Sequence, residues 1–161
     1  MADRGAFDDM KVELEHGEIV RMNPPYAPHG AAVARVIMAL GQAVGGSGVT
    51  VSGEAGIVLS DDTVFAFDVA LVRGAVPDGR YRPEAIALVI EIAASSVDRD
   101  LGAKLSEYAR AGIPIYWVVD VDAKVTHVMA GPGDQGYARR DVVRFGEPLA
   151  LPEGLGAIVL D

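Results

Sequence analysis

The chain has 161 residues, a formal net charge of −9 and no cysteine, and half of its residues are hydrophobic. This length and composition predict a single globular domain and exclude an intrinsically disordered chain, and the lack of cysteine excludes disulfides and thiolate metal sites. The acidic charge argues against a protein that grips long nucleic acid through a broad basic face.

The sequence predicts neither a membrane span nor a signal peptide. No apolar run approaches the ~18 residues of a membrane span, and the first ten residues lack the apolar core of a signal peptide. We therefore expect a cytoplasmic protein that forms one domain over residues 1–161.

The N-terminal half predicts a hairpin, a helix and three strands. Residues 1–10 are expected to be disordered, whereas residues 11–25 alternate apolar and polar side chains around a His-Gly pair and end at two prolines. Apolar residues at helical spacing predict a helix over residues 29–44, which a glycine-rich connector ends. Strands are predicted at about 49–52, 55–59 and 64–72.

The C-terminal half predicts one helix among strands. The helix covers about residues 95–112, with Ser95 and Asp98 as a capping box and Gly112 as the stop. This order of elements predicts a mixed α+β domain in which a central mixed sheet is flanked by helices. Strands are predicted at 85–93, at 115–120 paired with 124–130, and in a last pair near 137–143 and 149–151.

Two of the predicted core strands each carry a single acid. Asp68 lies in VFAFDVALV and Glu91 in IALVIEIAA, and burying an unpaired carboxylate costs about 4–7 kcal/mol. Because neighbouring strands lie ~4.8 Å apart, the two carboxylates can converge on one divalent cation, and oxygen ligands favour Mg²⁺ or Mn²⁺. The alternative is that each acid lies at a strand end and contacts an arginine, a backbone N–H or solvent.

Lys104 is the third candidate for the same site. It follows Asp100 by one helical turn, so an exposed ion pair between them is the alternative interpretation. However, Lys104 shares a helical stripe with Leu101, Leu105 and Tyr108, the face expected to pack on the sheet. Its ammonium group could then lie beside the two acids and orient a nucleophile or stabilise a pentavalent transition state.

The segments around these three residues resemble a known family. The block ALVIEIAASSVDRDLGAKLSEYARAGIPIYWVVD, residues 87–120, closely resembles the Uma2 (DUF820) family, as do the upstream segments HGEIVRMNPP and FDVALVR. The resemblance extends from about Glu15 to about Met129. It implies a restriction-endonuclease-like fold of the PD-(D/E)XK superfamily and a nuclease activity.

The resemblance also implies roles for individual residues. Asp68 matches the metal-binding aspartate of the family, Glu91 the glutamate of its core strand, and Lys104 a lysine displaced onto the following helix. The usual lysine position of the superfamily, two residues after the glutamate, is Ala93 here. The site also departs from the family where Pro-Asp is replaced by Phe67-Asp68, which favours altered geometry or weak activity.

Two further residues match polar positions of the family. Glu18 and His29 are expected to support catalysis by placing water or substrate. For Glu18, an ordinary hairpin carboxylate is the alternative, and for His29 a helix-entry histidine bonded to the backbone.

These observations lead to one hypothesis and one rival. The hypothesis is a Mg²⁺-dependent endonuclease, most simply acting on DNA, in which Asp68 and Glu91 hold the metal and Lys104 positions or deprotonates the attacking water. The backbone carbonyl of Ile92 is a candidate third ligand, and analogy with related folds suggests a homodimer. The rival is an inactive binding or assembly module of the same fold, which the charge of −9 favours. A positive cleft would favour the nuclease, and its candidate residues are Arg35, Arg73, Arg80, Arg82, Arg99 and Lys104.

Overall fold

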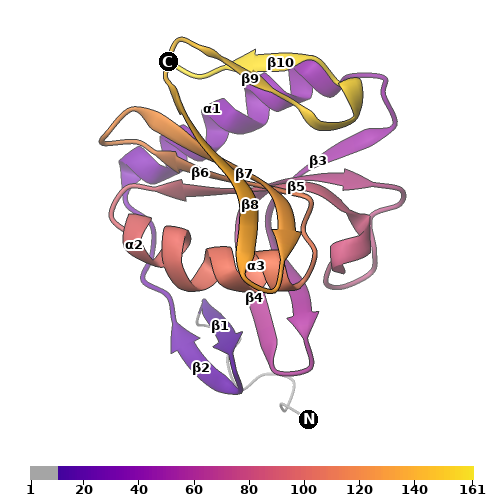
Figure 1. The fold of residues 1–161 in the computed structure, drawn as a ribbon, viewed down its shortest axis with the longest axis vertical. Helices are drawn as coiled ribbons and strands as arrows, with labels where there is room; N and C mark the ends of the chain where they lie inside the picture. Colours follow the sequence, from indigo (N-terminus) through magenta and orange to yellow (C-terminus); the bar gives the residue numbers. More distant parts are fainter. Residues whose placement is uncertain (1–10) are drawn as a thin grey trace.

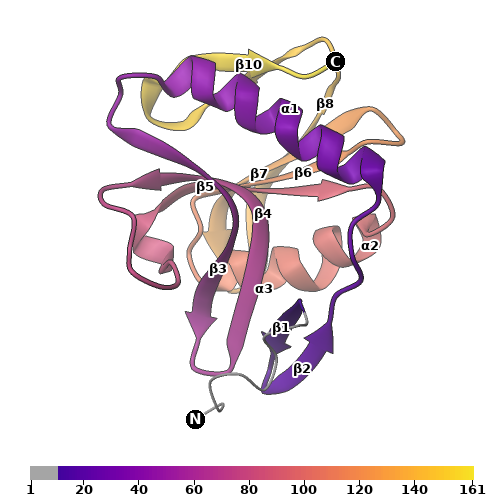
Figure 2. The ribbon, with the colours of Figure 1, turned by 180° about the vertical axis from the view of Figure 1, so that it is seen from behind.

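A computed structural model describes residues 11–161 of the chain as a central sheet covered on both faces (Figures 1 and 2). The expected disorder of residues 1–10 lies outside the described residues. No helix of the described part is long and apolar enough to cross a membrane. In chain order the elements are β1 (Val12–Glu15), β2 (Glu18–Arg21), α1 (Ala27–Val44), β3 (Val49–Ser60), β4 (Thr63–Arg73), η1 (Pro83–Ala85), β5 (Ile86–Ala93), α2 (Val97–Arg99), the π-helical turn η2 (Asp100–Lys104), α3 (Leu105–Arg110), β6 (Ile115–Asp120), β7 (Val125–Gly133), β8 (Gly136–Arg144), β9 (Pro148–Ala150), η3 (Pro152–Gly154) and β10 (Ala157–Val159).

The central sheet is mixed, as the sequence predicts. Seven strands follow the order β2-β1-β4-β5-β6-β7-β8, and β3 joins the sheet by pairing with β4. Strands β5 and β6 are parallel, whereas the other neighbours are antiparallel. A parallel pair needs a crossover connection, and the segment α2-η2-α3 supplies it.

Two layers cover the sheet. Helix α1 and the small β9–β10 sheet pack on one face, and the α2-η2-α3 segment packs on the other (Figures 1 and 2). Strand β5 is therefore buried along its whole length, and β4 and β6 along most of theirs. Strands buried on both faces are nearly continuous apolar runs, which explains why Asp68 and Glu91 are conspicuous in the sequence.

Several local expectations differ from the structure. The two strands predicted over residues 49–59 form the single strand β3, and α1 begins at Ala27 because a proline is well suited to the first turn of a helix. The predicted last strand pair is wrong. A two-residue loop joins β7 to β8, so β8 extends the main sheet while β9 pairs with β10.

The predicted helix over residues 95–112 is divided into three parts. The capping box is wrong, because Ser96 precedes the first helical residue and its hydroxyl donates to Asp100 Oδ2 at 2.5 Å. The turn from Asp100 to Lys104 is π-helical, a form often found at functional sites, and it buries both of these charged residues. Gly112, with φ of 80°, follows the helix as predicted.

Candidate active site

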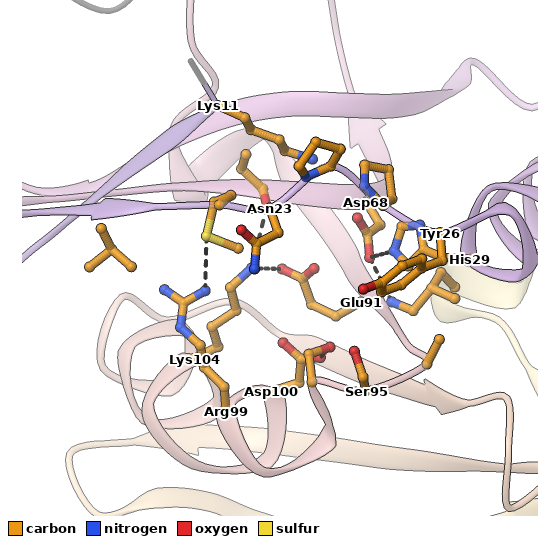
Figure 3. Close-up of a pocket in the computed structure, with 18 of the residues that line it drawn as sticks. Lys11, Asn23, Tyr26, His29, Asp68, Glu91, Ser95, Arg99, Asp100 and Lys104 are labelled. Atoms are coloured by element: carbon orange, nitrogen blue, oxygen red, sulfur yellow. Dashed lines mark hydrogen bonds and ion pairs between the residues drawn. The ribbon is translucent and has the colours of Figure 1, made fainter.

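A pocket of about 310 Å³ lies where the β1–β2 hairpin, the start of α1 and the segment from β5 to η2 come together (Figure 3). Asp68 from β4, Glu91 from β5 and Lys104 from η2 all line it. His29 from the first turns of α1 lines it as well. The structure therefore brings together four of the five site residues that the sequence predicts.

Asp68 is held by two donors on one of its oxygens. Asp68 Oδ2 accepts hydrogen bonds from the Ile92 backbone N–H at 2.7 Å and from His29 Nε2 at 3.1 Å. Burial raises the pKa of Asp68, but these two hydrogen bonds together with the charges of His29 and Lys104 outweigh burial and hold the pKa below its usual value. The same contact raises the pKa of His29, because the Asp68 carboxylate stabilises the imidazolium.

Glu91 is almost fully buried and is bonded through one oxygen. Glu91 Oε1 accepts hydrogen bonds from Lys104 Nζ at 3.0 Å and from the Tyr108 hydroxyl at 2.8 Å. Burial raises the pKa of Glu91 to about 8; the ammonium of Lys104 opposes this shift, while the nearby carboxylates of Asp68 and Asp100 add to it. Burial therefore disfavours the ionised form of Glu91 in the free protein, and a bound cation would favour it.

Lys104 is buried and lies between two carboxylates. Its Nζ is 3.0 Å from Glu91 Oε1 and 3.1 Å from Glu13 Oε1, and it donates to the Ala66 carbonyl at 3.4 Å. Burial lowers the pKa of Lys104, but the negative charges of Glu91 and Glu13 outweigh burial and raise the pKa above its usual value. The amine therefore stays charged at neutral pH. Within residues 11–161, Lys104 forms no ion pair with Asp100, so the exposed-pair interpretation is wrong.

Glu13 is a buried acid that the sequence analysis does not single out. Both of its oxygens are occupied: Oε1 accepts from the Ala66 N–H at 2.9 Å and contacts Lys104, and Oε2 accepts from Arg99 at 2.7 Å. Burial opposes ionisation, but Lys104, Ala66 and Arg99 together lower the pKa of Glu13. In an alternating strand an acid is expected to face solvent, so no sequence signal identified Glu13 as the partner of Lys104.

The remaining acids divide between the pocket and the surface. Glu18 on β2 is exposed and does not line the pocket, as expected of an ordinary hairpin carboxylate. Asp100 does line the pocket, and burial raises its pKa. From the sequence, Asp100 is expected only as a surface partner of Lys104, because the π-helical turn that buries both residues has no clear pattern in the sequence.

Two carboxylate oxygens remain available for a cation. Asp68 Oδ1 and Glu91 Oε2 make no hydrogen bond with residues 11–161, and neither is among the fully buried polar atoms without a partner. Within the same residues, no three His, Asp or Glu side chains are grouped as a metal site. Two carboxylates fit Mg²⁺, which usually binds one or two carboxylates and takes its other ligands from water and phosphate.

The charges around the pocket are mixed. Of the six basic residues expected to form a positive cleft, only Arg99 and Lys104 line the pocket, and both are paired with acids. Lys11 and Arg21 at the β1–β2 hairpin add two further cations. The pocket is therefore neither strongly positive nor uniformly negative.

Comparison with known proteins identifies a family and similar solved structures. The Uma2 family, described as "Putative restriction endonuclease", matches residues 4–161. No curated protein matches the chain. The crystal structure of "a putative nuclease belonging to DUF820" from Anabaena variabilis ATCC 29413 is similar with a TM-score of 0.71 and 16% identity, covering 91% of this chain and 83% of that chain. At this identity the similarity shows a shared fold, which confirms the predicted fold class.

Proposed function

The chain belongs to the Uma2 family, and from this membership we propose that it is a divalent-metal-dependent nuclease that hydrolyses phosphodiester bonds in DNA. The family description indicates a restriction-endonuclease-like nuclease. The metal and the DNA substrate are the proposed part. The observation that supports them best is the pair of free carboxylate oxygens, Asp68 Oδ1 and Glu91 Oε2, in one pocket beside a charged lysine.

Asp68 and Glu91 are the proposed ligands of Mg²⁺ or Mn²⁺, and the Ile92 carbonyl remains a predicted third ligand. A cation held there supplies positive charge that polarises a phosphodiester and lowers the pKa of water. The Ile92 N–H and His29 orient Asp68 by binding its second oxygen. The Tyr108 hydroxyl does the same for Glu91. Such outer contacts hold ligands in place and are expected to increase metal affinity.

Lys104 has an electrostatic role in this proposal. Because its pKa is raised, the amine cannot accept a proton from water at neutral pH, so of the two roles considered from the sequence we retain positioning. Its ammonium, fixed by Glu91 and Glu13, is suited to stabilise the negative charge that develops on the phosphoryl oxygens in the transition state.

Calorimetric titration with Mn²⁺ and Mg²⁺ tests the metal site. We expect binding to the wild type and loss of binding in Asp68→Ala and Glu91→Ala, whereas Asp141→Ala, an exposed acid on β8, serves as the matched control. A parallel assay measures Mg²⁺-dependent cleavage of single-stranded and double-stranded DNA. Equal metal binding in all four proteins would overturn the proposed site.

The rival function is an inactive binding or assembly module. The net charge of −9 and the pairing of both Lys104 and Arg99 with acids favour it. It predicts that metal binds weakly or not at all and that no DNA is cleaved at any Mg²⁺ or Mn²⁺ concentration. Purified protein that is folded, as judged by a cooperative thermal transition, and yet inactive on both DNA forms would support the rival.

A further inference from the structure

We propose that the pocket binds an unpaired nucleotide of a single DNA strand, with its base stacked on Tyr26 and the flanking phosphates beside Lys11 and Arg21. This inference rests on the proposed nuclease function and specifies its substrate. These three residues line the pocket but have no part in the proposed cation site.

Tyr26 presents an aromatic ring at the pocket. Its side chain lines the pocket together with His29 and Asp68 (Figure 3), yet the residue is 75% exposed. The ring is also held on a stiff segment, because Pro24 and Pro25 precede it and Pro28 follows in the first turn of α1. An exposed aromatic ring stacks on a base without regard to its identity, and a stiff backbone limits the conformational entropy lost on binding.

The depth of the acids favours an unpaired strand. Asp68 and Glu91 are 8% and 2% exposed, so a scissile phosphate has to enter the pocket to reach them. The β1–β2 hairpin contributes one wall and the segment around Arg99 another. Duplex DNA is stiff over about 150 base pairs and bends at a cost, whereas a single strand turns one nucleotide inward easily.

The number of free cations also favours a short contact with few phosphates. Arg21 forms no ion pair with residues 11–161, and Lys11 forms only an exposed pair with Glu54, at 3.9 Å. The other two cations of the pocket, Arg99 and Lys104, are paired with acids. Two available cations match about two phosphates, far fewer than the 6–10 contacts of proteins that track along a duplex.

Binding of a fluorescein-labelled single strand, followed by anisotropy with Ca²⁺ in place of Mg²⁺, tests the inference. We expect Tyr26→Ala to weaken binding about fivefold or more, in the range that base–aromatic stacking provides, and Tyr26→Phe to bind as the wild type does. Met38→Ala is the matched control, because Met38 is a large exposed apolar side chain of α1, 64% exposed, that does not line this pocket. Thermal transitions of all variants establish that each is folded.

Salt dependence and a duplex of the same sequence complete the test. For two phosphate contacts on a single strand, the logarithm of the binding constant is expected to fall with the logarithm of salt concentration at a slope of about −1.4, and Arg21→Gln should reduce the slope by about half. The duplex should bind more weakly than the single strand. Equal or tighter duplex binding, a slope near −5 or steeper, or an unchanged affinity in Tyr26→Ala would overturn the inference.

Failure of the inference can be separated from failure of the proposed function. If neither DNA form is cleaved with Mg²⁺ or Mn²⁺, the nuclease proposal fails, and the binding measurements still decide whether Tyr26 contacts an unpaired base. If DNA is cleaved but the duplex is the better substrate and Tyr26→Ala cleaves normally, the nuclease proposal holds and the inference about its substrate is wrong.

Discussion

The replacement Glu91→Gln is expected to stabilise the free protein although it removes a proposed metal ligand. Burial raises the pKa of Glu91 to about 8 from 4.5. Between these two values the folded state binds more protons at this site than the unfolded state does. Stability contributed by the protonated carboxyl is therefore lost as pH rises through this window. Glutamine stays uncharged at every pH, and its side-chain oxygen can still accept from Lys104 and Tyr108.

The structure sets the size of this effect. In the unfolded state the pKa of Glu91 is 4.5, so pH 7 lies about 2.5 pH units above it. Each unit corresponds to about 1.4 kcal/mol, so keeping Glu91 buried at pH 7 costs about 3 kcal/mol of stability. For a chain of this size, each kcal/mol shifts the melting temperature by roughly 2–4 °C. Glu91→Gln should thus melt several degrees above the wild type at pH 7 and close to it at pH 5.

The assay is a series of thermal melts at pH 5, 7 and 8, with and without Mg²⁺ or Mn²⁺. Added metal should raise the melting temperature of the wild type and leave that of Glu91→Gln unchanged, since ligands stabilise only a state that binds them. Asp141→Asn, which changes an exposed acid on β8, is the control. A Glu91→Gln protein that melts below the wild type at pH 7 would refute the reasoning, because it would mean that an ionised Glu91 stabilises the fold through Lys104.

Three further predictions concern the surroundings of the two acids. Lys104→Met should abolish cleavage and lower the free energy of unfolding by about 3–5 kcal/mol, because it removes the cation beside Glu91 and leaves Glu13 with Arg99 alone. Denaturant unfolding measures this, and an unchanged midpoint would contradict it. In Asp68→Asn, the raised pKa of His29 should fall, and NMR titration of the imidazole measures this. In the wild type, the stability contributed by protonated His29 is lost as pH rises through its folded pKa, and in the variant this loss should vanish. Glu18→Ala should bind Mn²⁺ as tightly as the wild type in calorimetry, because Glu18 is exposed. Glu13→Gln should lower the melting temperature, because it weakens the contacts with Lys104 and Arg99. Weaker Mn²⁺ binding in Glu18→Ala and an unchanged melting temperature in Glu13→Gln would show that the wrong hairpin acid was placed at the site.

The central strands were predictable because their composition reflects their position. β4, β5 and β6 are covered by helices or by the β9–β10 sheet, so nearly every side chain has to be apolar. The single acids Asp68 and Glu91 are therefore visible against this background. In contrast, the pairing of β8 depends on a short loop after β7 and on contacts far along the chain, and local periodicity predicted the wrong partner.

The sequence by itself determined the candidates Asp68 and Glu91, because lone charges in apolar segments are costly enough to require a purpose or a partner, and Lys104, because it shares an apolar helical stripe. Only the tertiary structure decided their chemical state. The π-helical turn and the β1–β2 hairpin bring Lys104 between Glu91 and Glu13, and this contact keeps the amine charged. The physical reason is that a pKa depends on burial and on charges within a few ångströms, and those distances arise when segments far apart in the chain pack together.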